Sequence, residues 1–125
     1  MSGTLVAPYP FAAHHYQRPP PFVCACEDGY VYVAGEIDIA TAPQLEHALA
    51  VGLSRASAVV LDLQDVTFLD SEGTRAIVMA SVLADATGRR LVLLHGPPDV
   101  DRLFALTGNA DQVVFFEPPI HSAAA

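Results

Sequence analysis

The sequence contains no lysine and no tryptophan, and its six arginines stand against fourteen acidic residues, which gives a formal net charge of −8. A protein that binds DNA or RNA needs a basic surface to neutralise phosphates, and this composition does not supply one. The same acidic balance argues against docking on anionic lipid surfaces. We therefore expect no direct nucleic-acid partner and no membrane partner.

Long apolar runs are also missing, since no stretch reaches the roughly 20 apolar residues that a membrane-spanning helix needs. The N-terminus has no basic region followed by an apolar core, so a secretory signal is not expected. Only two cysteines are present, Cys24 and Cys26, and two ligands alone make no zinc site. We expect a cytoplasmic protein whose cysteines are small, partly buried apolar residues. A redox or metal role for them is the less favoured alternative.

What the sequence does contain is enough apolar material for one domain. Its 125 residues are 52% hydrophobic and 16% charged, which is typical of a chain with a packed core. Residues 1–21 are rich in proline and show no apolar period, so we expect a flexible N-terminal arm there. Residues 118–125 are expected to form a C-terminal tail. The ordered domain is expected over residues 22–117.

Strand and helix patterns alternate within residues 22–117. Helices are expected from Thr41 to Leu53, from Ser71 or Gly73 to Thr87, and from Asp99 to Thr107. The first two strands are joined by Asp28-Gly29, which is a strong hairpin signal. The order β-β-α-β-α-β-α-β predicts an α/β fold with a mixed, mostly parallel sheet whose first pair is antiparallel. Five apolar or β-branched segments are predicted to be the strands: 22–27, 30–37, 58–63, 91–94 and 113–116.

In such a sheet, ligands and partners meet the loops at the carboxyl ends of the strands. Three segments are expected to form these loops and to share one edge: 35–41, 65–73 and 95–99. The first two contain most of the polar residues that interrupt otherwise apolar sequence: Glu36, Asp38, Thr41, Asp65, Thr67, Asp70, Ser71 and Glu72.

Ser71 is the most informative of these residues, because it lies between two acids at the start of a predicted helix. Ser and Asp are preferred N-caps, so Asp70 and Ser71 can be explained as residues that bond the unpaired amides of the first turn. The functional interpretation is a modification site. A phosphate there would lie near the positive end of the helix dipole and would add about −1.5 to −2 charges to the surrounding surface. Without further context the cap is the simpler interpretation.

The helix after Ser71 is unusually apolar, with nine apolar residues among the eleven of segment 76–86. A surface helix normally keeps a charged outer face. Either this helix is deeply buried or a partner covers its outer side. Ala76, Ala80 and Ala84 suit close packing on a sheet, so burial is favoured.

Enzyme motifs are missing from the sequence. There is no Gly-x-Ser-x-Gly elbow, no Walker-type phosphate loop, no His-Glu-x-x-His and no Gly-x-Gly-x-x-Gly pattern. The carboxylates of Glu36, Asp38 and Asp70 could do acid/base chemistry, but such groups more often cap loops or stay solvated. We expect no catalytic residue, no cofactor and no metal site, and a small carboxylate enzyme is the least favoured alternative.

The chain resembles the STAS domain family, which is named for sulfate transporters and anti-sigma factor antagonists. The likeness spans roughly residues 22–117, and two separated motifs fall in the right order on the predicted loops. Five segments carry it: Gly35–Pro43, Leu61–Leu63, Val66–Gly73, Gly88–Leu91 and Val100–Gly108.

The resemblance implies a bacterial, non-enzymatic regulator of transcription that works by partner switching. Antagonists of this type bind an anti-sigma factor that is also a serine kinase, which frees the sigma factor. The kinase phosphorylates the serine of the Asp-Ser-x-Gly motif, here Ser71, the modified antagonist is released, and a phosphoserine phosphatase resets it. The implied partner-binding residues are Glu36, Asp38, Thr41, Asp70, Ser71, Glu72, Gly73 and Thr74.

Two positions depart from the family pattern. Glu72 stands where Ser or Thr is usual, and Thr74 stands where Leu is usual. Glu72 places a permanent negative charge beside the phosphoacceptor, which could alter kinase recognition or mark a relative that binds without being phosphorylated. The alternative function is therefore a STAS-type accessory subunit of a transport or signalling complex, in which Ser71 is only a helix cap.

Overall fold

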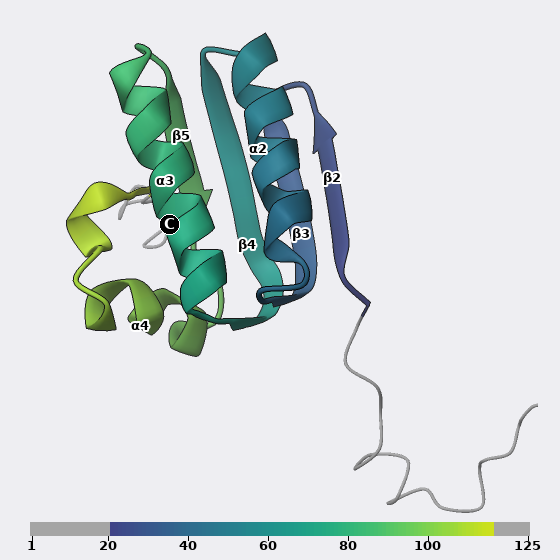
Figure 1. Ribbon diagram of the computed structural model, residues 1–125, viewed down its shortest axis with the longest axis vertical. Coiled ribbons are helices and arrows are strands. Elements are labelled where there is room, and N and C mark those ends of the chain that lie inside the picture. Colours follow the sequence, from purple (N-terminus) through teal and green to yellow (C-terminus); the bar gives the residue numbers. More distant parts are fainter. Residues whose placement is uncertain (1–20, 117–125) are drawn as a thin grey trace, which may run out of the picture.

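In the computed structural model, which describes residues 21–116, the chain opens with the predicted hairpin (Figure 1). Strand β2 (Val23–Glu27) pairs antiparallel with β3 (Tyr30–Ile37). Between them, Asp28 and Gly29 have φ angles of 50° and 78°. A two-residue type I′ turn needs positive φ at both central positions, so the Asp-Gly pair sets this connection.

The remaining strands are parallel and are separated by helices, so the predicted mixed sheet and its β-β-α-β-α-β-α-β order are confirmed. The strand order in the sheet is β2-β3-β4-β5-β6, and pairing is parallel from β3 onward. A short 3-10 turn, η1 (Ala110–Gln112), precedes the last strand. The other elements are α2 (Ala42–Arg55), β4 (Ala58–Leu69), α3 (Ser71–Ala86), β5 (Arg90–Leu94), α4 (Pro98–Leu106) and β6 (Val114–Phe115).

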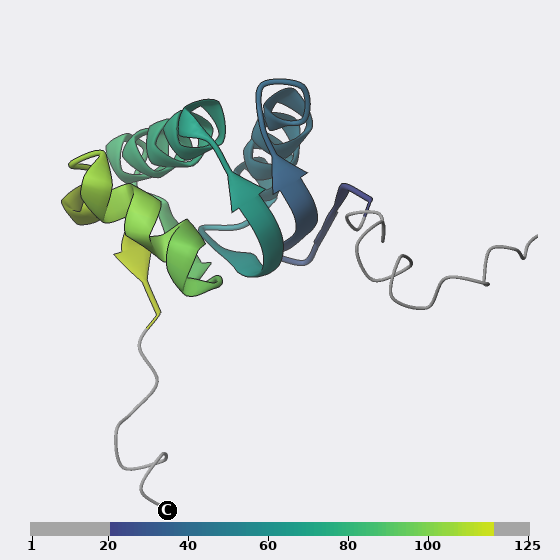
Figure 2. The same ribbon diagram turned by 90° about the horizontal axis from the view of Figure 1, so that it is seen from below.

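Helices α2 and α3 lie side by side on one face of the sheet (Figures 1 and 2). The predicted stripe of Leu45, Leu49 and Leu53 on α2 is buried there. Helix α4 lies beyond the carboxyl end of the short β5, next to the last part of β4 (Figure 1). Alternate residues of the three central strands are buried in the core: Val31, Val33, Val59, Leu61, Leu63, Leu91 and Leu93.

Strand β4 is longer than predicted, because it continues from Leu63 to Leu69. The predicted loop over residues 65–73 is therefore wrong for residues 65–69. Polar residues suggested a loop, but Val66 and Leu69 still point into the core. Their backbone pairs with residues 35–37 of β3 across an irregularity in the register. Because β4 stays paired with β3 as far as Leu69, helix α3 begins next to the end of β3.

On the side of the sheet away from α2 and α3, two tyrosines bond to aspartates of β4. The Tyr30 hydroxyl donates to the Asp62 carboxylate, and the Tyr32 hydroxyl donates to Asp65 at 2.6 Å. The hydrogen bond to Asp62 raises the pKa of Tyr30 to about 12, with smaller contributions from burial and nearby charge. The bond to Asp65 likewise raises the pKa of Tyr32. Both bonds fasten β3 to β4.

Of the expected arm over residues 1–21, all but Pro21 lies outside the described residues, as does the expected tail over 118–125. None of the helices within residues 21–116 has the length and apolar character needed to cross a membrane.

We predict that the protein loses stability at alkaline pH through Tyr30. In the unfolded chain its phenol ionises near pH 10, whereas the folded state holds the proton to about pH 12. The unfolded state therefore loses its proton first, so the free energy of unfolding falls as pH rises from 10 toward 12. The chain has no lysine, and the other tyrosines and the cysteines, which also titrate near this window, are the same in wild type and in Tyr30→Phe. Urea unfolding at pH 9, 10 and 11 should show a steeper loss for wild type than for Tyr30→Phe. Equal slopes would contradict the assignment.

Candidate partner-binding site

The carboxyl ends of β3 and β4 meet at one end of the sheet, as the sequence predicted. The amide of Asp70 donates to the carbonyl of Ile37 at 3.1 Å. Gly73 lies so close to β3 that a Cβ there would be 2.6 Å from side-chain carbons of Ile37 and Leu69. Only a residue without a side chain lets α3 begin this near to β3. This contact brings the segment after β3 beside the start of α3.

Asp38 and Thr41 hold the loop between β3 and α2 in a fixed shape. One carboxylate oxygen of Asp38 accepts the amides of Ala40 and Thr41 at 2.9 and 3.1 Å. The Thr41 hydroxyl accepts the amide of Asp38 at 2.9 Å and donates to the carbonyl of Glu36 at 2.9 Å. Thr41 occupies the predicted N-cap position of α2, but its side chain bonds no amide of that helix. Its hydroxyl is used within the loop instead.

Asp70, and not Ser71, caps helix α3. The Asp70 carboxylate accepts the amide of Gly73 at 2.9 Å from an extended backbone position. Ser71 is the first residue of the helix, its side chain is exposed, and its hydroxyl has no hydrogen-bond partner among residues 21–116. The interpretation of Ser71 as a helix cap is therefore corrected, because the neighbouring carboxylate already performs that task.

The other predicted residues of this segment divide into an inner and an outer group. Gly73 is buried, and Thr74 is only 1% exposed, with its hydroxyl donating to the Asp70 carbonyl at 2.9 Å. We therefore assign Gly73 and Thr74 to the construction of the site rather than to its contact surface. Glu36 and Glu72 are exposed, whereas Asp38 is half-buried in its loop. The outward-facing part of the site is a serine flanked by acids.

Sequence reasoning missed two large apolar side chains at this end of the sheet. Ile39, at the tip of the Asp38 loop, is 73% exposed, and Phe68, near the end of β4, is 49% exposed. The one sign of their role in the sequence was weak: each is a large apolar residue inside a segment, 35–41 or 65–73, that was predicted to be a polar loop. Apolar side chains are frequent anchors in interfaces, so both are candidate contacts for a partner at this end of the sheet.

Helix α3 is buried on one side, as favoured, and its outer side also carries exposed apolar residues, among them Met79, Val82 and Leu83. Of the three alanines expected to pack on the sheet, Ala76 and Ala84 are buried, whereas Ala80 is half-buried. A groove of about 730 Å³ lies between α2 and α3, and Arg75 and Glu46 are among its lining residues. Its apolar lining includes Ala50, Leu53, Met79, Ala80 and Leu83.

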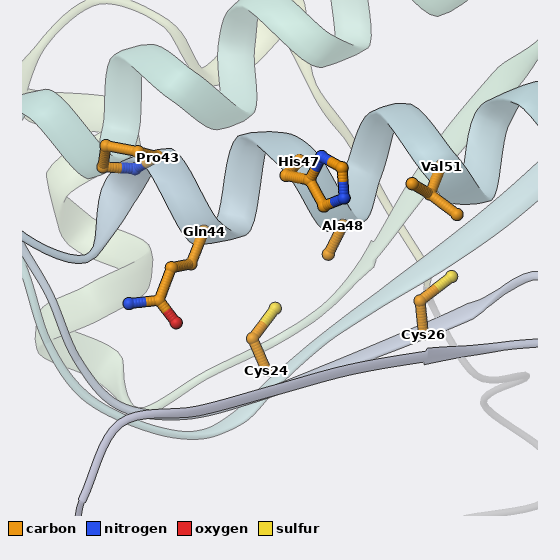
Figure 3. Close-up of a pocket in the computed structure, with 7 residues that line it drawn as sticks. All are labelled: Cys24, Cys26, Pro43, Gln44, His47, Ala48 and Val51. Atoms are coloured by element: carbon orange, nitrogen blue, oxygen red, sulfur yellow. The ribbon is translucent and has the colours of Figure 1, made fainter.

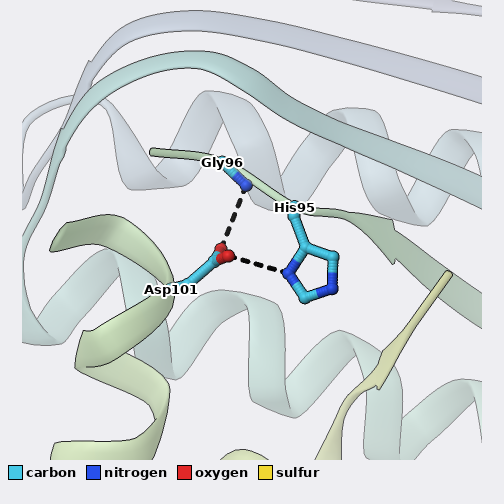
Figure 4. Close-up of polar contacts among 3 residues, drawn as sticks. All are labelled: His95, Gly96 and Asp101. Carbon is cyan, nitrogen blue, oxygen red and sulfur yellow. Dashed lines mark hydrogen bonds and ion pairs between the residues drawn. The ribbon is translucent and has the colours of Figure 1, made fainter. Parts of the chain in front are cut away.

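The third predicted loop, after β5, is held by a carboxylate as well (Figure 4). Asp101 of α4 contacts Nδ1 of His95 at 2.7 Å and accepts the amide of Gly96 at 3.0 Å. The His95 ring stacks on Phe115 of β6 at 4.3 Å between centroids. Phe115 in turn meets the buried Phe104 edge-on at 5.7 Å. These contacts fix the start of α4 against the last strand.

The two cysteines do not join the candidate site. Both are free thiols of intermediate exposure that point from β2 toward α2, where with His47 they line a pocket of about 530 Å³ (Figure 3). Partial burial, and then the neighbouring Cys26, raise the pKa of Cys24, which disfavours a reactive thiolate. Within residues 21–116, no three His, Cys, Asp or Glu side chains are grouped as metal ligands.

The sequence and the fold were compared with those of known proteins. The family model described as Mlab, STAS domain matches residues 25–115. The chain belongs to the STAS domain family. The resemblance inferred from the sequence motifs is thereby confirmed, and the matched range covers both segments that build the candidate site.

Relatives within this STAS family are named as anti-sigma factor antagonists. The anti-sigma-B factor antagonist of Listeria monocytogenes is 37% identical over 82 residues, which are 65% of this chain and 72% of that protein. An anti-sigma factor antagonist from Mycobacterium paratuberculosis has a similar structure, with a TM-score of 0.62 and 25% identity over 83% of this chain and 91% of that one. The phosphorylated form of the Bacillus cell fate determinant SpoIIAA shares the fold, with a TM-score of 0.56 and 16% identity over 83% and 96% of the two chains.

We predict that Gly73→Ala destabilises the protein although alanine is the better helix former. The added methyl would lie 2.6 Å from two side chains, and overpacking of this kind costs about 1–3 kcal/mol. The control is Gly52→Ala in α2, where the nearest atom, Cys26 Sγ, would be 3.3 Å away. Chemical denaturation should show a larger loss for Gly73→Ala. A variant as stable as the Gly52→Ala control would contradict the close contact.

Proposed function

We propose that this STAS protein is a cytoplasmic anti-sigma factor antagonist that acts by binding and has no catalytic activity of its own. Its partner is an anti-sigma factor that is also a serine kinase, and the bound state leaves the sigma factor available for transcription. The observation that carries this proposal is the Ser71 hydroxyl, which is exposed at the first position of α3 and is not used to cap the helix. It lies beside the fixed Asp38 loop. The names of the relatives support the same role.

Phosphorylation of Ser71 is the proposed switch. The Ser71 Oγ attacks the γ-phosphorus of ATP held by the kinase, and an O–P bond forms. The bond from that phosphorus to the oxygen shared with ADP breaks, and the hydroxyl proton passes to a base on the kinase. Because Asp70 already satisfies the Gly73 amide, Ser71 can be modified without removing the cap of α3. A phosphoserine phosphatase transfers the phosphoryl group to water and restores the hydroxyl.

Charge then decides whether the complex persists. A kinase that modifies Ser71 must place its nucleotide phosphates next to this residue, so the new phosphate faces the remaining ADP. The modification adds about −1.5 to −2 charges to a surface where Asp38, Glu36 and Glu72 are already acidic. Like charges brought together at an interface cost several kcal/mol, and each 1.4 kcal/mol is tenfold in affinity. The modified protein is therefore released without any change of fold.

The proposed contact surface combines this charge with apolar anchors. Ile39 and Phe68 are large, exposed apolar residues at this end, and the loop that presents Ile39 is held by Asp38 and Thr41. A loop that is already ordered loses little freedom on binding, so more of the contact energy remains as affinity.

A second candidate is an accessory subunit of a transport or signalling complex that is not phosphorylated. Glu72, which stands where the family usually has Ser or Thr, is the observation that favours it. In that role the partner would bind the acidic, unmodified Ser71 surface permanently.

Incubation with ATP and each anti-sigma-type serine kinase of the same organism separates the two candidates. We expect intact-mass spectrometry to show one added phosphoryl group on wild type and none on Ser71→Ala. The matched control is Ser57→Ala, which changes an exposed serine in the turn between α2 and β4 and should be modified as wild type is. No addition to wild type, or addition to Ser71→Ala, would contradict the switch.

A fixed negative charge should imitate part of the switch. We expect Ser71→Asp to weaken binding of the kinase at least tenfold, because a carboxylate then meets the nucleotide phosphates. Its melting temperature should stay within about 2 °C of wild type, since an acid at a helix start is compatible with the dipole. Isothermal titration and thermal melting measure the two effects, with Ser57→Asp as the matched control. Unchanged affinity would count against the proposal, and a collapsed fold would indicate a structural role for Ser71.

A further inference from the structure

Arg75 lies one helical turn after Ser71 and forms an ion pair with Glu72. Its Nη1 is 3.9 Å from the Glu72 carboxylate, and the two side chains are 73% and 47% exposed. Such an exposed pair is weak and is easily exchanged for a better partner. The other charged side chains at the ends of β3 and β4 are the acids Glu36, Asp38 and Asp70.

The helix geometry places Arg75 over Ser71. Residues four apart lie on the same side of a helix, and helical side chains lean toward the N-terminus. Arg75 is at position i+4 from Ser71, so its guanidinium covers the turn that Ser71 begins. The observed contact with Glu72, at i+1 from Ser71, shows that the guanidinium already reaches this turn.

We propose that phosphorylation of Ser71 moves Arg75 from Glu72 onto the phosphate. A phosphoserine dianion carries about twice the charge of a carboxylate, and its oxygens accept paired hydrogen bonds from a guanidinium. Arg75 is thus a positioning residue of the modified state, and the exchange makes and breaks only non-covalent contacts. The inference rests on the proposed function for the identity of the modification.

The exchange gives Glu72 a physical explanation. Before modification, Arg75 neutralises the charge of Glu72 beside Ser71, so a kinase meets an ion pair with no net charge. After modification the cation is drawn to the phosphate, and the Glu72 carboxylate is left without it. The departure from the family pattern at Glu72 is therefore compensated by an arginine one turn along the same helix.

The test uses the full chain with phosphoserine incorporated at position 71 during translation, so that no kinase is needed. The probe is the ³¹P chemical shift of that phosphate as a function of pH. A nearby cation favours the dianion, so Arg75→Gln should raise the midpoint of the second ionisation by about 0.15–0.4 pH units. Arg75→Lys should restore most of the wild-type midpoint. The control is Arg102→Gln, which removes a similar exposed pair with Asp99 at 3.4 Å on α4 and should leave the midpoint unchanged.

Competition with Glu72 identifies the exchange itself. In the Glu72→Gln background Arg75 has lost its ion-pair partner, so Arg75→Gln should raise the midpoint by more than it does beside Glu72. The inference would be overturned if Arg75→Gln shifted the midpoint no more than Arg102→Gln does. It would also be overturned if the Arg75→Gln shift were the same with Glu72 and with Gln at position 72. These results are independent of the proposed function: a kinase that binds the serine and phosphoserine forms equally would contradict the switch and leave the ³¹P result standing.

Discussion

The approach of α3 to β3 is the contact on which the candidate site depends. The hydrogen bond from Asp70 to the Ile37 carbonyl and the bare surface of Gly73 let the helix start directly against the strand. The consequence is that Ser71 emerges beside the Asp38 loop rather than a helix diameter away. Two segments more than thirty residues apart thereby form one surface.

One device recurs in all three loops at this end of the sheet, where an aspartate side chain accepts backbone amides. Asp38 does so for Ala40 and Thr41, Asp70 for Gly73, and Asp101 for Gly96. Three of the fourteen acidic residues are therefore structural, because these carboxylates satisfy amides that loops and helix starts leave unpaired. On this surface the Ser71 hydroxyl stays exposed and has no hydrogen-bond partner among residues 21–116.

The sequence was sufficient for the topology, because strand and helix patterns alternate with clear turn signals such as Asp28-Gly29 and a leucine stripe on α2. It was insufficient where local composition and tertiary pairing disagree. Residues 65–69 were predicted to be part of a loop because of the polar residues among them, but pairing with β3 keeps them in a strand. The choice between Asp70 and Ser71 as cap could not be made from residue type, since both are good caps, and only the backbone geometry decided it. Likewise, the exposure of Ile39 and the pairing of Glu72 with Arg75 depend on directions of side chains that no pattern encodes.

We propose that a phosphate on the Ser71 hydroxyl changes the charge of a preformed surface and thereby ends a protein complex. The most direct measurement is the affinity of the cognate anti-sigma kinase, loaded with ADP, for the full chain carrying either serine or phosphoserine at position 71. We expect at least a tenfold weaker complex for the phosphoserine form, with an unaltered circular dichroism spectrum. Equal affinity for the two forms would contradict it.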